Sequence, residues 1–249
     1  MAHEAMHSHE NEKDITWKAG RDHLNRIKDG GGFQSGMSHD KHAFPEKVHS
    51  LCCMDERVVS ERNDSVYSAG SGILIKDNPK KRAAFVGELK KAGVKNVTTH
   101  EGCGAVSLYA KQKNISVEEA QVEARQWAKD LSKELGGAYE GELTVSPQDY
   151  HVAQVAYYDF TGRFNPSMTG DYPAGFVISR KYMPAEDATA QTSVGVGIAK
   201  GDHGYGKRFD KKTPFTIVIV AENDADLKLG KKELQALSGA DVTIDGFIK

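Results

Sequence analysis

The stretch VKNVTTHEGCGA, residues 94–105, joins a β-branched run to two residue types that bind metals. The run predicts a buried strand that ends at His100, with Cys103 three residues later. A second apolar run, LCCMDERV at residues 51–58, stops in the same way at cysteine. Thiolate and imidazole are ligands of Zn²⁺, and two Cys with one His leave the fourth tetrahedral position free, as in catalytic sites.

The residues between these two strands predict a helix, because Asn78 and Pro79 are typical of a helix start and Gly93 of a helix end. A strand, a helix and a second strand form a β-α-β unit, whose strands pair in parallel. The carboxyl ends of both strands then lie at one sheet edge. We therefore expect an α/β fold with a central, mostly parallel sheet flanked by helices.

The three cysteines are Cys52, Cys53 and Cys103, an odd number that argues against a secreted disulfide framework. Adjacent residues of a strand point to opposite faces, so only one of Cys52 and Cys53 can share a site with His100. The other is expected to pack in the core as a small apolar residue.

The composition of the 249 residues excludes several classes of function. Charged residues make up 27% and the formal net charge is −2, so there is no basic field for nucleic acid. No apolar run approaches the roughly 20 residues that cross a bilayer, and no signal-peptide region is evident. We expect a soluble, cytoplasmic protein without a nucleic-acid or membrane partner.

At these motifs the sequence resembles the β-class carbonic anhydrases. Their Cys-x-Asp-x-Arg motif matches residues 53–57, their Ala-Gly turn matches residues 69–72, and their His-x-x-Cys-Gly motif matches residues 100–104. The resemblance runs from about residue 46 to 164 and implies the fold of that family. It selects Cys53, with His100 and Cys103, as the metal ligands.

The resemblance implies a zinc carbonic anhydrase, a lyase (carbonate dehydratase) that hydrates CO₂ reversibly to bicarbonate and a proton by means of zinc-bound hydroxide. Asp55 is then expected to accept a hydrogen bond from the metal-bound water, while Arg57 holds Asp55 by a bidentate ion pair. A free carboxylate would otherwise become the fourth ligand. Since two thiolates cancel the charge of zinc, activity should rise with pH. Cadmium is a substitute that soft thiolates accept.

Two other functions remain open. The same site could hydrolyse a related heterocumulene such as CS₂ or COS. Alternatively, the chain could be a catalytically silent metal-binding protein of this fold whose C-terminal third covers the pocket. The resemblance also implies a homodimer or a larger assembly built from dimers.

The chain is expected to have three parts. Residues 1–45 form an N-terminal tail, helix and loop, residues 46–164 the zinc-binding core, and residues 165–249 an extension of that domain or a small second subdomain. Residues 1–12 predict a disordered tail, whose His3, His7 and His9 could also scavenge metal weakly. A helix should follow over residues 14–28, with Trp17 and Leu24 as candidates for core or dimer contacts.

The periodicity and turn residues predict the other elements as well. Helices are expected over residues 104–111, 116–136 and 227–237, and strands over residues 47–53, 65–68, 142–145, 151–160, 174–179, 193–198, 215–221 and 242–248.

Overall fold

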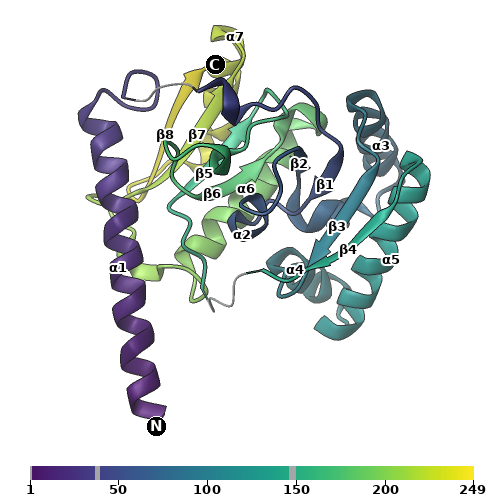
Figure 1. Cartoon of the computed structure of the whole chain (residues 1–249), viewed down its shortest axis with the longest axis horizontal. Helices are drawn as coiled ribbons and strands as arrows, with labels where there is room; N and C mark the ends of the chain where they lie inside the picture. The colour runs from purple at the N-terminus through teal and green to yellow at the C-terminus, as the bar shows by residue number, and fades with distance from the viewer. Residues whose placement is uncertain (1, 37–39, 146–149) are drawn as a thin grey trace.

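The computed structural model describes residues 2–36, 40–145 and 150–249, with side chains from residue 11 onward. In this part of the chain the strands form two four-stranded sheets, in the orders β2-β1-β3-β4 and β6-β5-β7-β8. All pairings between these strands are parallel, and helices flank both sheets (Figure 1). The α/β class is confirmed, but two sheets replace the single central sheet that we expected.

The first sheet contains the predicted β-α-β unit. Strand β1 (Ser50–Cys52) pairs in parallel with β3 (Asn96–His100), Ser50 opposite Asn96. Between them lies α3 (Pro79–Ala92), whose start is capped by the Asn78 side chain and whose end is Gly93, in the left-handed region at φ 84°. Because β1 and β3 pair in parallel, their carboxyl ends lie at one edge of the sheet.

The first sheet is completed by β2 (Ser65–Tyr67) and β4 (Tyr139–Leu143). Strand β4 begins and ends earlier than the predicted strand over residues 142–145. Helix α5 (Val117–Leu135) packs on β3 and β4, and α4 (Gly104–Lys113) packs on α5 at the end of the sheet. A capping box of Ser116 and Glu119 starts α5. Both helices were predicted.

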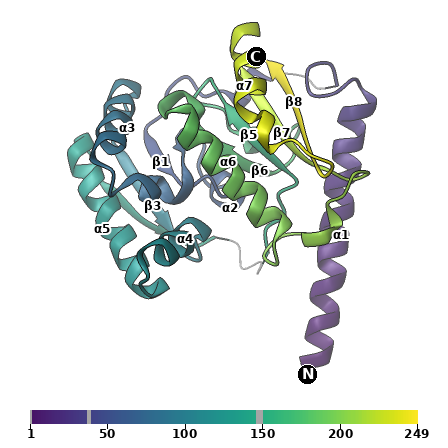
Figure 2. The same cartoon turned by 180° about the vertical axis from the view of Figure 1, so that it is seen from behind.

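The second sheet consists of β5 (Val155–Asp159), β6 (Gly175–Ile178), β7 (Phe215–Ala221) and β8 (Val242–Ile248). Helices α6 (Ala185–Lys200) and α7 (Asp224–Leu234) pack on it, as Figure 2 shows from behind. Strand β5 is shorter than predicted, and residues 151–154 lie outside it. The remaining elements are α2 (Glu56–Val59) and the 3-10 turns η1 (Lys41–Ala43), η2 (Ala69–Ile75), η3 (Pro166–Met168), η4 (Arg180–Tyr182), η5 (Gly206–Arg208) and η6 (Gln235–Leu237).

The predicted strand over residues 193–198 is wrong, because these residues belong to α6. The alternation of Val194, Val196 and Ile198 is typical of a strand. The face of α6 that is buried carries small and polar residues at helical spacing instead, among them Ala188, Thr192 and Gly195. Gly195 lies so close to the ring of Phe176 that a Cβ there would be 3.2 Å from it.

Helix α1 (Ala2–Asp29) lies along the side of the second sheet, near β8 (Figure 1). It begins at Ala2, so the disordered tail that we expected over residues 1–12 is wrong. The predicted weak metal binding by His3, His7 and His9 is not tested, because the structure describes side chains only from residue 11 onward. Leu24 is buried, and Trp17 packs edge-on against Tyr205 and Phe209. The apolar stripe of α1 therefore has a partner within the chain.

The two sheets are joined by hydrogen bonds between backbone groups. The Val177 amide of β6 donates to the Met54 carbonyl, and the Ser179 amide donates to the Tyr67 carbonyl, both at 3.0 Å. The chain passes from the first sheet to the second between β4 and β5. The boundary that we expected for the zinc-binding segment, residue 164, lies after β5. None of the helices in the described ranges is long and apolar enough to span a membrane.

Candidate metal centre

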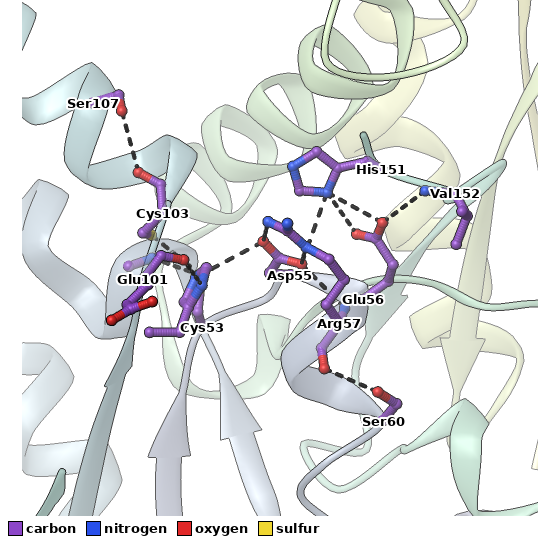
Figure 3. Close-up of polar contacts among 12 residues, drawn as sticks. Cys53, Asp55, Glu56, Arg57, Ser60, Glu101, Cys103, Ser107, His151 and Val152 are labelled. Carbon is purple, nitrogen blue, oxygen red and sulfur yellow. Dashed lines mark hydrogen bonds and ion pairs between the residues drawn. The ribbon is translucent and has the colours of Figure 1, made fainter. Parts of the chain in front are cut away.

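Cys53, His100 and Cys103 come together at the carboxyl edge of the first sheet. Cys53 directly follows β1, His100 is the last residue of β3, and Cys103 is the N-cap of α4. Their ligand atoms lie within 4.8 Å of one another, and all three side chains are buried. Figure 3 shows Cys53 and Cys103 beside Asp55. The three residues can hold a metal ion.

His100 is oriented as a metal ligand. Its Nδ1 lies 2.8 Å from the Glu101 carbonyl oxygen, which only accepts, so Nδ1 carries the hydrogen. Its Nε2 is buried and has no hydrogen-bond partner among the described residues. An imidazole held by a backbone carbonyl at one nitrogen and bare at the other is the usual arrangement of a histidine that binds zinc. The donor set and this bare nitrogen fit Zn²⁺.

The thiol groups of Cys53 and Cys103 are hydrogen-bonded to each other. The Sγ atoms of Cys53 and Cys103 are 3.7 Å apart. Their hydrogen bond and burial raise the pKa of Cys53 well above its usual value. The same hydrogen bond lowers the pKa of Cys103, helped by the amides of Val106 and Ala105 at the start of α4. The predicted position of Cys103 at a helix N-terminus is confirmed, and it favours the thiolate that a metal needs.

Neighbouring groups also shift the pKa of His100. Burial lowers this pKa, but the thiol of Cys53 and the carboxylate of Asp55 raise it to about 9. Metal binding must therefore release protons from this site, and affinity for metal should fall in acid.

The turn at residues 69–72 passes directly over the thiols. Gly70 has φ 53°, and its amide donates to Cys53 Sγ at 3.3 Å. A Cβ at Gly70 would lie 2.7 Å from Ile73 and 3.1 Å from Ala105. The Ala-Gly pair of the predicted turn therefore serves a close approach of backbone to ligand. Gln191 of α6 supports it, since its side-chain oxygen accepts from the Ala69 amide at 2.8 Å.

Cys52 lies on the opposite face of the strand, as the alternation of side chains predicts. Its Sγ donates to Ser65 Oγ at 3.2 Å and accepts from Thr98 Oγ1 at 3.2 Å. Burial raises the pKa of Cys52 to about 11, so this thiol stays protonated at neutral pH. Cys52 is a core residue and does not reach the site.

Asp55 and Arg57 form the bidentate pair beside the three ligands. Arg57 Nε and Nη2 donate to the two oxygens of Asp55 at 3.0 and 2.8 Å, and the Arg57 amide donates to Oδ1 at 3.0 Å. Asp55 Oδ2 lies 3.8 Å from the bare His100 Nε2. Burial raises the pKa of Asp55, but the hydrogen bonds from Arg57 and the nearby positive charges lower it to about 2. The carboxylate is therefore ionised and held next to the ligands.

A second buried cluster, which the sequence did not reveal, adjoins this pair. Glu56 follows Asp55 at the start of α2, and His151 precedes β5. The two side chains are hydrogen-bonded, and His151 Nδ1 lies 3.8 Å from Asp55 Oδ1 (Figure 3). In the sequence, Glu56 is an additional charged residue within the motif at residues 53–57. Nothing in the sequence near His151 links it to residues almost a hundred positions earlier.

A groove lined by α4 and α6 adjoins the site. Its lining includes Arg57, His151 and the glycines at positions 102 and 104, which are close in sequence to the ligand Cys103. Val194 and Ile198 of α6 contribute apolar walls. Two residues of the wrong strand prediction therefore line this groove.

Comparison of the chain with family models, with curated proteins and with solved structures finds no match. The fold and the site therefore define an α/β protein with a candidate metal centre, and no relative supplies a function.

Proposed function

We propose that the chain is a zinc-dependent carbonic anhydrase that hydrates CO₂ reversibly to bicarbonate and a proton. One observation carries the proposal: three buried ligand atoms converge within 4.8 Å, while Asp55, held by Arg57, lies 3.8 Å from the bare nitrogen of His100. Such a restrained carboxylate is what a water-activating centre needs, and a closed structural zinc site does not need it.

Zinc, when bound, supplies a Lewis acid that makes water nucleophilic near neutral pH. Asp55 would accept a hydrogen bond from a water molecule at the site and so orient it toward the substrate. Because the pKa of Asp55 is lowered to about 2, its carboxylate is ionised and can accept a hydrogen bond at neutral pH. Arg57 engages both oxygens of Asp55, which keeps the carboxylate from binding the metal.

The groove supports an enzyme over a silent metal protein. It is lined by Arg57 and by residues on either side of Cys103, so a small molecule bound in it would lie next to the site. Its apolar part, from α4 and α6, suits an uncharged substrate such as CO₂.

Stopped-flow CO₂ hydration, with the metal content measured on the same sample, tests the proposal. We expect about one zinc per chain and a rate that rises between about pH 6 and 9. CS₂ and COS are assayed in parallel. Turnover of either without CO₂ hydration would assign the site to heterocumulene hydrolysis. Full zinc with no turnover of the three substrates would favour a silent metal-binding protein.

The proposal includes a homodimer in the cytoplasm. The resembling family completes its substrate pocket with residues of a neighbouring subunit, which supports a dimer here. A site that depends on two free thiols is best kept in a reducing compartment, which supports the cytoplasm.

A further inference from the structure

A pocket of about 270 Å³ lies between α1 and the second sheet (Figure 1). One wall is formed by α1 and the turn that follows it, and the other by β7, β8 and the loop before β7. Arg21, Asn25 and Lys28 line it from α1, at a spacing that puts them on one face of the helix. Among the described residues, the candidate metal ligands do not belong to this lining. The pocket is therefore separate from the metal centre.

Arg21 is held in place with its charge partly out of water. Its Nη1 donates to the Pro214 carbonyl at 3.0 Å, and its guanidinium lies over the ring of Trp17, with Cζ 5.5 Å from the ring centroid. Its Nε is buried and has no hydrogen-bond partner in the described part of the chain. Burial lowers the pKa of Arg21, and the negative charge of Asp210 raises it by less. The guanidinium therefore carries a positive charge that the surrounding protein only partly offsets.

The lining of the pocket is positively charged. Lys28 of α1 and Lys212 of the loop before β7 add two cations to Arg21, whereas Asp245 is the single carboxylate among the described residues that line it. Asp245 is already occupied, since its two oxygens accept from two backbone amides at 3.1 and 2.7 Å. Within the described ranges, none of the three cations has an ion-pair partner. Three cations against one carboxylate give the lining a net charge of +2.

The strand side of the pocket offers hydroxyl groups. Thr216 of β7 and Thr243 of β8 are paired across the parallel strands, and their Oγ1 atoms are 3.3 Å apart. Both line the pocket, as does the side-chain amide of Asn25. Hydroxyl and amide groups donate to oxygen, so these side chains can hold the oxygens of an anion that the cations attract. Leu24 and Ile244 give the lining an apolar part.

We propose that this pocket binds a small phosphorylated molecule. A phosphate ester carries about two negative charges at neutral pH, which matches the net charge of the lining. A guanidinium binds phosphate oxygens in pairs, and lysines add point charges. The volume is close to the roughly 300 Å³ at which pockets for organic ligands begin, so there is room for an organic part against Leu24 and Ile244. This inference does not depend on the proposed CO₂ hydration.

An NMR titration of the full ¹⁵N-labelled chain with glycerol 3-phosphate tests the proposal, because it gives both the position and the affinity of the ligand. The amide signals of Thr216 and Thr243 should shift and saturate in wild type at millimolar ligand or below. The signals of Gly102 and Gly104 report on the groove at the candidate metal centre. Shifts confined to these two glycines, or no shift at all, would overturn the proposal.

Three variants in the pocket and one outside it measure what holds the phosphate. Affinity should fall about tenfold or more in Arg21→Gln, the range expected when a hydrogen bond to a charged group is lost. Lys212 is exposed, so Lys212→Gln should leave the fold intact and weaken binding by about twofold to fivefold. Asn25→Asp places a second carboxylate in the pocket and should abolish binding. Arg26→Gln is the matched control and should bind like wild type, because Arg26 is exposed on the same helix outside the lining.

The variants can also refute the site. Wild-type affinity in both Arg21→Gln and Asn25→Asp would overturn the proposal. An equal loss in Arg26→Gln and Lys212→Gln would do the same, because it would indicate general attraction to a cationic surface. If circular dichroism shows that Arg21→Gln is unfolded, the two exposed positions Asn25 and Lys212 decide the question.

Vesicles that contain phosphatidic acid distinguish a lipid headgroup from a soluble ester. We expect the protein to remain in solution when the vesicles are sedimented. Sedimentation with the vesicles, without any shift from glycerol 3-phosphate, would overturn the proposal, because the phosphate recognised would then belong to a membrane surface.

Discussion

Arg57 donates to both oxygens of Asp55, so removing the guanidinium frees a carboxylate beside three metal-binding residues. In Arg57→Ala we expect that carboxylate to complete a closed tetrahedron around the metal. Zinc should stay, and CO₂ hydration should fall by about a hundredfold or more. Metal analysis, stopped-flow assays and a crystal structure of the zinc-loaded variant measure the three quantities. Wild-type turnover in Arg57→Ala would remove the pair from the mechanism.

Asp55→Ala is expected to behave differently, although it breaks the same ion pair. It removes the carboxylate that would compete for the metal, so the fourth position should stay open, and water there should lack its hydrogen-bond acceptor. Activity should again fall with zinc retained. The crystal structures of the two variants distinguish them. A protein ligand in the fourth position of Asp55→Ala would contradict this prediction.

The two faces of the first strand offer a matched pair of cysteine variants. Cys103→Ser should lose most of its zinc, because a hydroxyl is a far poorer ligand than a thiolate at neutral pH. Cys52→Ala removes a buried thiol that points away from the site. Within the described part of the chain, this thiol is hydrogen-bonded to the hydroxyls of Ser65 and Thr98. This variant should keep about one zinc per chain in elemental analysis. Equal metal in both variants would refute the ligand assignment.

At the scale of elements, the local signals were sufficient for most of the fold. Asn78, Pro79 and Gly93 delimit α3, and the runs over residues 215–221 and 242–248 match β7 and β8. Helix α6 was missed because its buried face is built from small and polar residues, which do not register as an apolar stripe. Burial against Phe176, a tertiary contact, decides its structure.

The candidate site divides in the same way. The convergence of His100 with Cys53 follows from parallel strand pairing, which a β-α-β pattern predicts. The pairing of Glu56 with His151 depends on how the second sheet is placed against the first. The packing of one sheet against another produces no hydrophobic periodicity in the sequence from which this pairing could be predicted. The predicted strand over residues 151–160 also included His151. In the structure β5 begins at Val155, so His151 lies in the preceding loop, where its side chain can point toward α2.

An ion pair between η4 and α7 should make stability depend on pH. Arg180 donates to both oxygens of Glu233 at 2.9 Å, and Tyr158 donates to one of them at 2.6 Å. Burial raises the pKa of Glu233, but these hydrogen bonds outweigh it and lower that pKa below the usual value. The pair therefore stabilises the fold above about pH 4.3, and its contribution is lost as the pH falls further.

Glu233→Gln tests this pair. At pH 7 we expect the free energy of unfolding to decrease by about 1.5–3 kcal/mol, the range for hydrogen bonds to charged groups. At pH 3 the difference from wild type should shrink, because the wild-type carboxylate is losing its charge. Urea unfolding at both pH values gives the numbers. Glu186→Gln, which removes the exposed partner of Lys81, serves as a control without effect. An equal loss at both pH values would show that charge is not the cause.

At the scale of the whole molecule, we predict a dimer of about twice 27.2 kDa in light scattering at micromolar concentration. This prediction is supported by the family resemblance alone. The apolar stripe of α1 does not support it, because Trp17 in that stripe packs against its own chain. A 27 kDa monomer with full activity would show that one chain completes the substrate pocket by itself.

Gln191 belongs to α6, yet its oxygen accepts hydrogen bonds from Ser68 and Ala69, in the turn whose next amide donates to Cys53. We therefore predict that the thiols reach their final positions only after the second sheet and its helix have docked on the first. Co²⁺ bound in this site would allow refolding to be followed by its visible absorption. Its thiolate absorption should develop with the docking of the two halves of the chain, after the helical signal of the first half has already recovered.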